Sequence, residues 1–249
     1  MIDYINQTYT ISERQLEASA KIVKSWPIQT QLHSEIILND RFYLHRKPCD
    51  LATSHDVIIY YHGSRDIAIT QSEYTNLLSL NDKYIIAFGQ ASGEQCTPYV
   101  DEYGFAAFGE IYWGLAGDQF EEDLLYTRAL ILDLQDQYNI NNIYFIGHSN
   151  SGVFALLLAL YLPNTFTKIV SHMGGIGYDP CLQLQFNQDA RKTPILFYTG
   201  EYDLHKEACE SAKTIFISQG FEVDLYIEQG LGHEYHHTCE SYILKWLTL

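Results

Sequence analysis

The most constraining feature of the sequence is a short polar turn between two apolar runs near the middle of the chain. The turn is Gly147-His148-Ser149-Asn150-Ser151-Gly152. Before it, Ile143-Tyr144-Phe145-Ile146 has the aromatic and β-branched character of a buried strand. After it, Val153 to Leu162 is apolar throughout and stops at Pro163, which suits a core helix and is too short to cross a bilayer. The sequence thus predicts a buried strand, a sharp turn that raises Ser149 above a sheet, and a buried helix.

Strands and helices are predicted to alternate along most of the chain. Further strands are expected at 57–61, 84–88, 169–170, 195–199 and 221–228, and helices at 121–138, at 204–219 and in a last segment ending near Leu249. A helix capped at Ser12 and ending before Pro27, and a hairpin over 34–47 that turns at Asn39-Asp40, are expected near the start. This alternation favours an α/β fold with a mostly parallel sheet covered by helices on both faces. No linker or repeat interrupts it, so we expect a single domain over residues 1–249.

Two of the predicted helices carry recurring apolar positions, and the second is predicted to be amphipathic. The helix at 121–138 has Leu124, Leu125 and Leu132 among its apolar residues. The helix at 204–219 places Ala208, Ala212, Ile215 and Phe216 on one face, with Gly220 as its C-cap.

Charge and cysteine usage narrow the function classes. The net charge of −16 argues against binding to nucleic acid and to anionic lipid. The N-terminus lacks the basic and apolar regions of a signal peptide, so we expect a cytoplasmic protein without a membrane span, although a secreted chain trimmed of its signal would look the same. Five widely spaced cysteines favour free, mostly structural thiols over a disulfide framework. The sequence does not indicate an oligomeric state.

Two residues downstream of the turn complete a catalytic constellation. Asp203 follows the strand at 195–199, and His233 follows the strand at 221–228. The carboxyl ends of parallel strands lie along one edge of a sheet, where the turn with Ser149 must also lie. The order Ser, acid, His at strand ends is that of the α/β-hydrolase triad. We therefore expect Ser149 as nucleophile, His233 as general base and Asp203 as the residue that orients the imidazole; Asp179, in the loop after the preceding strand, is a second candidate for the acid.

Other segments are expected to complete the site. His62-Gly63-Ser64 follows a strand at the place where this fold supplies part of its oxyanion hole, so the backbone N–H groups of Ser64 and Asn150 are the expected donors. The irregular segments 89–120 and 173–192 are expected to line the pocket, with Tyr103, Tyr112 and Trp113 as candidate substrate-lining residues. His62 and His148, beside the oxyanion donors, are expected to serve packing or to lie at the surface.

The chain resembles the esterase branch of the α/β-hydrolases that includes polyhydroxybutyrate depolymerases and feruloyl esterases. The resemblance rests on the segments 41–45, 57–63, 147–150, 200–203 and 230–235 and covers about 34–249, leaving residues 1–30 as an N-terminal extension outside it. It implies a serine esterase that needs no cofactor and no metal and acts on a small-molecule or polymeric ester. The chain departs from the branch at Ser151, where glycine is usual, and many members of the branch are secreted.

Three alternatives stay open at this point. A peptidase or thioesterase could use the same triad, because the triad does not select the leaving group. His233-Glu234-Tyr235-His236-His237 also fits the H-E-x-x-H zinc motif, although Gly230 and Gly232 place its first histidine at a loop-to-helix junction and a third ligand is hard to find. A non-catalytic binding protein on a hydrolase scaffold is the third alternative.

Overall fold

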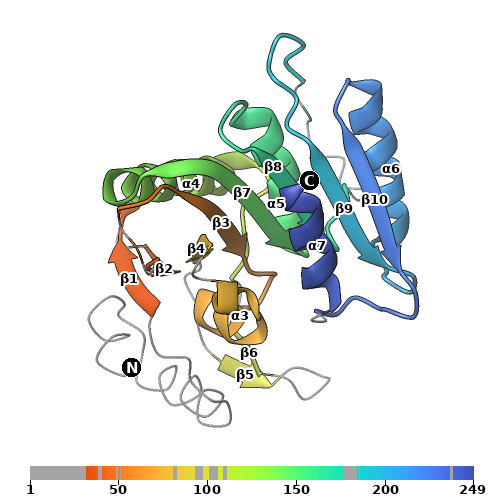
Figure 1. Cartoon of the computed structure of the whole chain (residues 1–249). Coiled ribbons are helices and arrows are strands. Elements are labelled where there is room, and N and C mark those ends of the chain that lie inside the picture. The colour runs from red at the N-terminus through yellow and green to blue at the C-terminus, as the bar shows by residue number, and fades with distance from the viewer. Residues whose placement is uncertain are drawn as a thin grey trace.

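A central eight-stranded sheet organises the protein in its computed structural model (Figure 1). The structure describes residues 32–249, except 39–40, 49, 51, 81–82, 93–97, 101–105, 109–110, 177–183, 185 and 236–237. The strands in spatial order are β1 (Leu32–Ile36), β2 (Phe42–Arg46), β4 (Tyr84–Gly89), β3 (His55–Tyr61), β7 (Ile140–His148), β8 (Lys168–His172), β9 (Ile195–Gly200) and β10 (Val223–Glu228). The strands β4 to β10 of this order are mutually parallel, whereas β1 and β2 form an antiparallel hairpin whose second strand pairs antiparallel with β4. A separate antiparallel pair joins β5 (Pro98–Val100) to β6 (Ala106–Phe108).

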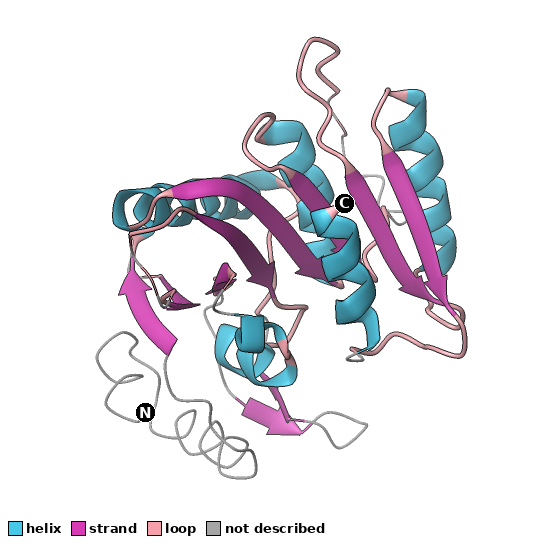
Figure 2. Cartoon of the chain, in the orientation of Figure 1, coloured by secondary structure: helices cyan, strands magenta, loops and turns pink. Residues whose placement is uncertain are grey.

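Helices cover both faces of the sheet, as Figure 2 shows. One face packs against α4 (Gly117–Gln137), α5 (Asn150–Tyr161) and α6 (Lys206–Ser218). The other face packs against α3 (Ala68–Tyr74), the 3₁₀ helix η2 (Leu77–Leu80) and α7 (Thr238–Thr248). Alternate residues of the central strands enter opposite cores, as period-two side chains must: Val57 and Ile59 face α4 and α5, whereas Ile58 and Tyr60 face α3 and α7.

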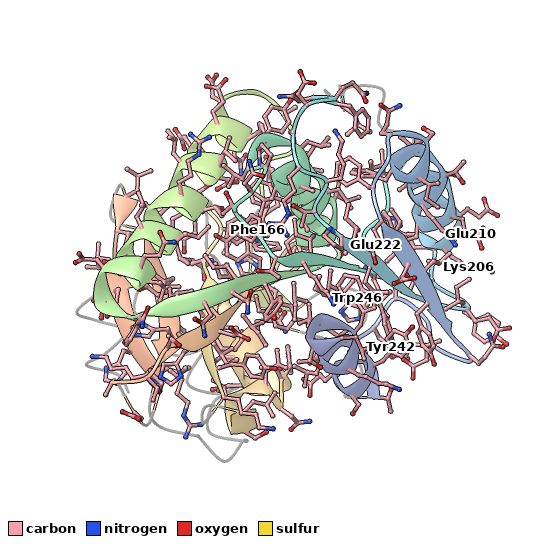
Figure 3. The ribbon with its side chains drawn as sticks, turned by 45° about the horizontal axis from the view of Figure 1, so that its top comes forward. Phe166, Lys206, Glu210, Glu222, Tyr242 and Trp246 are labelled. Carbon is pink, nitrogen blue, oxygen red and sulfur yellow. The ribbon has the colours of Figure 1, made fainter. Side chains whose placement is uncertain are left out.

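Aromatic contacts fix α7 against the edge of the sheet. Tyr242 of α7 stacks on Tyr226 of β10 with ring centroids 3.9 Å apart, and the indole N–H of Trp246 donates to Asp224 Oδ2 at 2.6 Å. Figure 3 shows Tyr242 and Trp246 projecting from this helix. These two contacts hold α7 against the last strand of the sheet.

The predicted fold class is confirmed, and the predicted strands and hairpin are present with ends shifted by a few residues. The helix expected to begin at Glu121 begins at Gly117, and α3 and η2 were not predicted. Of the apolar residues named for this helix, Leu125 and Leu132 are largely exposed, and α4 buries other residues: Phe120, Asp123, Tyr126, Thr127, Leu130, Ile131 and Leu134. In α6 the buried residues are Cys209, Ala212 and Phe216, and Ile215 is exposed. Gly220 adopts φ +83° after α6, as expected for a C-cap glycine. The helix predicted between Ser12 and Pro27 lies outside the described residues.

Candidate active site

The turn after β7 holds Ser149 in a strained conformation. Its φ of 56° and ψ of −116° are costly for a residue with a side chain, and such strain persists only where the surroundings enforce it. The backbone N–H of Ser149 donates to His172 O on β8 at 2.8 Å. A Cβ on Gly147 would lie 2.0 Å from the carbonyl oxygen of Ser151, so only glycine allows the strand and helix to approach this closely. The strand–turn–helix predicted from the sequence is therefore present, with the serine between β7 and α5.

Ser151, which occupies a position where glycine is usual, stabilises this turn. Its side chain is completely buried, and its hydroxyl accepts the backbone N–H of His148 at 2.8 Å. The same hydroxyl is 2.7 Å from the carbonyl oxygen of Tyr61 on β3 and 3.0 Å from that of His148, and it can donate to either. The serine thus links the turn to the neighbouring strand, a contact that glycine could not make.

A chain of hydrogen bonds joins Ser149 to His233 and Asp203. His233 Nε2 is 2.9 Å from Ser149 Oγ, and His233 Nδ1 is 2.9 Å from Asp203 Oδ1. The three residues come from the loops after β7, β9 and β10, in the positions that the sequence predicts. The Asp203 side chain is buried, whereas about a quarter of the His233 side chain is exposed. The imidazole therefore lies between a buried carboxylate and a hydroxyl at the edge of the sheet.

The surroundings of Asp203 keep its carboxyl ionised. Burial acts to raise the pKa of this carboxyl, but three hydrogen bonds outweigh burial and hold the pKa below its ordinary value. These bonds come from His233, from the backbone N–H of His205 at 2.8 Å and from the hydroxyl of Thr199 at 2.8 Å. An ionised Asp203 can accept the Nδ1–H of His233 and leave Nε2 free to accept a proton from Ser149.

Three further histidines lie close to the Ser149–His233–Asp203 chain. His148 stacks on the His233 ring with centroids 5.9 Å apart, and His205 contacts it edge-on at 5.0 Å. His148 Nδ1 is also 3.3 Å from Nδ1 of His172 on β8. Burial lowers the pKa of His148 to about 3 and also lowers that of His205, so both rings are neutral near pH 7. The sequence did not predict that His205 and His172 lie here, because it shows no periodicity or motif at either residue.

The loop after β3 lies beside the turn. Tyr61 is paired with Gly147 across β3 and β7, and a Cβ on Gly63 would be 3.3 Å from the Cβ of Ser149. Ser64 follows on an exposed turn, and Asn150 is the first residue of α5. The two predicted oxyanion residues thus come from segments that meet at Ser149. His62 is buried, with Nε2 accepting the backbone N–H of Ala91 at 3.1 Å, which confirms the packing role expected for it.

Of the predicted substrate-lining residues, Trp113 is corrected by the structure. Its side chain has no exposed surface and stacks on Tyr61 with centroids 3.8 Å apart, so it belongs to the core and cannot line a substrate groove. Tyr112 is 42% exposed and remains available to a ligand. Tyr103 and the alternative acid Asp179 lie outside the described residues, as do parts of the two loops predicted to line the pocket.

The structure bears on the zinc alternative only at the first histidine of the motif, because His236 and His237 lie outside the described residues. The H-E-x-x-H motif places its histidines on a helix, but His233 lies in the loop after β10. Both ring nitrogens of His233 are already within hydrogen-bonding distance of Ser149 and Asp203. Within the described residues no group of three or more His, Cys, Asp or Glu side chains is arranged to hold a metal ion.

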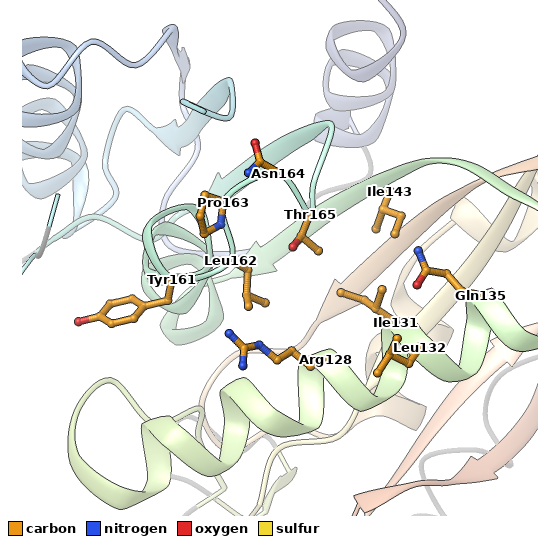
Figure 4. A pocket seen from close by; sticks show the side chains of 10 residues that line it. All are labelled: Arg128, Ile131, Leu132, Gln135, Ile143, Tyr161, Leu162, Pro163, Asn164 and Thr165. Carbon is orange, nitrogen blue, oxygen red and sulfur yellow. The ribbon is translucent and has the colours of Figure 1, made fainter. Parts of the chain in front are cut away.

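A cavity of about 480 Å³ lies away from Ser149, between α4 and the end of α5 (Figure 4). None of its lining residues belongs to the predicted site: they are Arg128, Ile131, Leu132, Gln135, Ile143, Tyr161, Leu162, Pro163, Asn164 and Thr165.

Among the helices of the described residues, none is both long and apolar enough to cross a membrane. Cys209 and Cys239 are buried thiols, in agreement with the expected structural role, and the other three cysteines lie outside the described residues.

The chain is similar to known proteins that are named as hydrolases and carboxylesterases. No protein-family model matches the chain. An uncharacterized hydrolase, R843, of Acanthamoeba polyphaga mimivirus is 25% identical over 247 residues, covering 85% of this chain and 77% of the relative. A probable carboxylesterase of Arabidopsis thaliana, SOBER1-like, is 31% identical over 111 residues, which cover 44% of this chain and 42% of the relative. The solved structure of FphF, a fluorophosphonate-binding serine hydrolase of Staphylococcus aureus, superposes with a TM-score of 0.63 at 12% identity, covering 84% of this chain and 92% of that one.

These similarities establish the α/β-hydrolase fold and a relationship to proteins named as hydrolases and carboxylesterases. They agree with the predicted esterase, whereas the polyhydroxybutyrate depolymerase and feruloyl esterase branch is not singled out among them. The alignment with the Arabidopsis relative spans less than half of that protein. The reaction and the substrate therefore have to be argued from the site itself.

Proposed function

We propose that the protein is a serine hydrolase that cleaves carboxylic esters through an acyl-enzyme. Ser149 is the nucleophile, His233 the general base and acid, and Asp203 the residue that orients the imidazole. The observation that carries this proposal is the pair of 2.9 Å hydrogen bonds that link His233 to Ser149 and to Asp203. The names of the relatives, hydrolase and carboxylesterase, support an ester as the substrate.

The proposed reaction has two halves. In the first, Ser149 Oγ attacks the carbonyl carbon while its proton passes to His233 Nε2. His233 then gives that proton to the alcohol as the ester C–O bond breaks, which leaves an acyl group on Ser149. In the second half, a water molecule gives a proton to His233 and attacks the acyl carbon, and the proton returns to Ser149 as the acid leaves. Asp203 stabilises the imidazolium in both halves without taking a proton.

The oxyanion that forms in each half needs donors on the side of Ser149 opposite His233. We assign this role to the backbone N–H groups of Ser64 and Asn150. The support is that Gly63 lies against Ser149 and that Asn150 begins α5, whose N-terminus carries a partial positive charge. One such donor typically contributes about 100- to 1,000-fold in rate.

The test is the reactivity of Ser149 toward a fluorophosphonate probe and an ester. Ser149→Ala should abolish labelling and lower turnover of nitrophenyl esters by about 10⁶-fold, the typical effect of removing such a nucleophile. Ser64→Ala is the matched control, because it removes a neighbouring hydroxyl and keeps the backbone donor, so labelling should persist. Equal labelling of the wild type and Ser149→Ala would refute the proposal. An absence of both labelling and turnover in the wild type would favour a non-catalytic binding protein.

The leaving group and chain length require a substrate panel. Nitrophenyl esters from acetate to palmitate, a feruloyl ester, a thioester and an amino-acyl amide cover the alternatives that the triad leaves open. We expect the oxygen esters to be turned over fastest. A higher kcat/KM for the amide or the thioester would replace the esterase assignment with a peptidase or a thioesterase.

A further inference from the structure

We propose that Trp113 is a positioning residue that keeps the two segments of the oxyanion hole in a fixed position relative to each other. The inference rests on the proposed function, because it concerns the segments that carry the Ser64 and Asn150 donors. Trp113 lies outside the Ser149–His233–Asp203 chain and has no exposed surface, so it acts through its neighbours rather than on the substrate. Three groups of contacts support this role.

The backbone of Trp113 holds the side chain of Asn150. The N–H of Trp113 donates to Asn150 Oδ1 at 2.6 Å, and Asn150 Nδ2 donates to the carbonyl oxygen of Trp113 at 3.2 Å. Both ends of the amide are therefore bonded to a single residue, which fixes the rotamer of Asn150. Because Asn150 directly follows the nucleophile, this pair of bonds restrains the peptide that carries one oxyanion donor.

The indole of Trp113 holds the other segment. Its Nε1–H donates to the carbonyl oxygen of His62 at 3.0 Å, two residues before Ser64. The ring is stacked on Tyr61 at an interplanar angle of 11°, so the indole cannot tilt away from this carbonyl without losing the stack. One residue thus bonds to both segments that meet at Ser149.

Trp113 is itself held from α4. The next residue, Gly114, donates its N–H to Asp123 Oδ2 at 2.6 Å, and a Cβ there would lie 2.5 Å from the backbone of Gln119. Asp123 is fully buried and pairs with Arg41 at 2.6 Å. The Arg41 guanidinium lies 5.6 Å from the centre of the Trp113 ring. This buried ion pair gives Trp113 a rigid support, so a displacement of either oxyanion segment must break contacts in the core.

We expect the loss of this positioning to weaken stabilisation of the transition state and to leave binding of the ester unchanged. An oxyanion donor works only within about 2.7–3.1 Å of the negative oxygen, a charge that the bound ester does not yet carry. Trp113→Phe keeps an aromatic ring on Tyr61 and removes the indole donor, together with the part of the buried ring that phenylalanine does not fill. We expect kcat to fall by about 10- to 100-fold, less than the loss of a whole donor, with KM changed by less than about threefold.

The deciding experiment combines steady-state kinetics with inhibition by a trifluoromethyl ketone, whose tetrahedral adduct places an oxyanion in the hole. In Trp113→Phe the inhibition constant should rise by the same factor as kcat/KM falls. Trp246→Phe is the matched control, because it removes the indole bond to Asp224 at the far edge of the sheet and should change neither quantity. Asn150→Ala removes the other end of the bridge and should behave like Trp113→Phe; it carries the test if Trp113→Phe does not fold.

The outcomes separate this inference from the proposed function. If the wild type turns over esters and Trp113→Phe keeps its kcat and its inhibition constant, the positioning role is wrong and the proposed function stands. A rise in KM alone would likewise overturn it, because that result would indicate lost ground-state binding. If the wild type neither turns over esters nor reacts with the fluorophosphonate, the proposed function fails, and the inference fails with it.

Discussion

Replacing Ser151 with alanine tests how the turn around Ser149 is stabilised. The substitution removes one buried oxygen and leaves the Cβ in place, so it alters hydrogen bonding with little change in packing. The N–H of His148 loses its acceptor, and the carbonyl of Tyr61 or His148 loses a donor. Leaving a buried polar group unsatisfied costs about 1–3 kcal/mol, more for the N–H than for a carbonyl that can keep another partner.

These contributions give an expected loss of about 2–4 kcal/mol in the free energy of unfolding, which is a large part of the 5–15 kcal/mol that typical domains possess. Ser151→Gly should cost about 0.5–1 kcal/mol more, because glycine adds backbone freedom to the unfolded chain. Urea unfolding followed by tryptophan fluorescence measures both values.

The control is Ser218→Ala, which removes an exposed serine hydroxyl that donates to Ile215 O at the end of α6. Its effect should stay within about 0.5 kcal/mol. If Ser151→Ala were as stable as Ser218→Ala, the hydroxyl would not stabilise the turn. If Ser151→Gly were more stable than the wild type, the serine would be a tolerated departure from glycine and the reasoning would be refuted.

Three further predictions concern the charged and titratable groups. Asp203→Asn should fold and still react slowly with fluorophosphonate, but its kcat should fall by about 10⁴-fold, because an amide favours the wrong histidine tautomer; an unchanged kcat would exclude the triad role. Arg41→Met and Asp123→Leu should each destabilise the protein by about 3–5 kcal/mol, whereas the double variant should recover much of that loss, as double-mutant unfolding can measure; additive losses would contradict a compensated ion pair. Burial lowers the pKa of His45 to about 3 and that of His62 to about 4. Between about pH 6.5 and pH 4 the unfolded chain therefore binds protons at these two residues, whereas the folded chain does not. Stability from these two residues should therefore be complete above about pH 7 and fall by about 3–4 kcal/mol at pH 5 in urea unfolding; equal stability at the two pH values would argue against neutral buried rings.

The parts of the fold that could be predicted from the sequence are those with strong local patterns. The apolar runs around Ser149 are long enough to predict β7 and α5, and the catalytic candidates directly follow apolar strands. The helix α3, with the sequence AITQSEY, has no apolar periodicity of its own and forms where the chain packs against β4 and β2. Exposed Leu125 and Leu132 show the converse case, because an apolar residue can lie on the outer face of α4 while Asp123 is buried by its pairing with Arg41.

The candidate site likewise has one part that the sequence predicts and another part that it does not. Its hydrogen-bonded chain follows from a motif and from strand order, which are both local or topological properties. The roles of Trp113 and Ser151 depend on partners far away in the sequence, at His62 and Tyr61, which no pattern connects to them. Trp113 was predicted to line the substrate site because it lies in an aromatic loop, but its burial depends on contacts that only the folded chain makes.

The most direct test of the proposed chemistry is detection of the acyl-enzyme itself. Wild-type protein turning over nitrophenyl acetate is quenched in acid, digested and analysed by mass spectrometry, with Ser149→Ala as the control. We predict one acetyl group on the peptide that contains Ser149, together with a burst of about one equivalent of nitrophenol. Turnover without acetyl on Ser149, or an equal acetyl content in Ser149→Ala, would contradict the account.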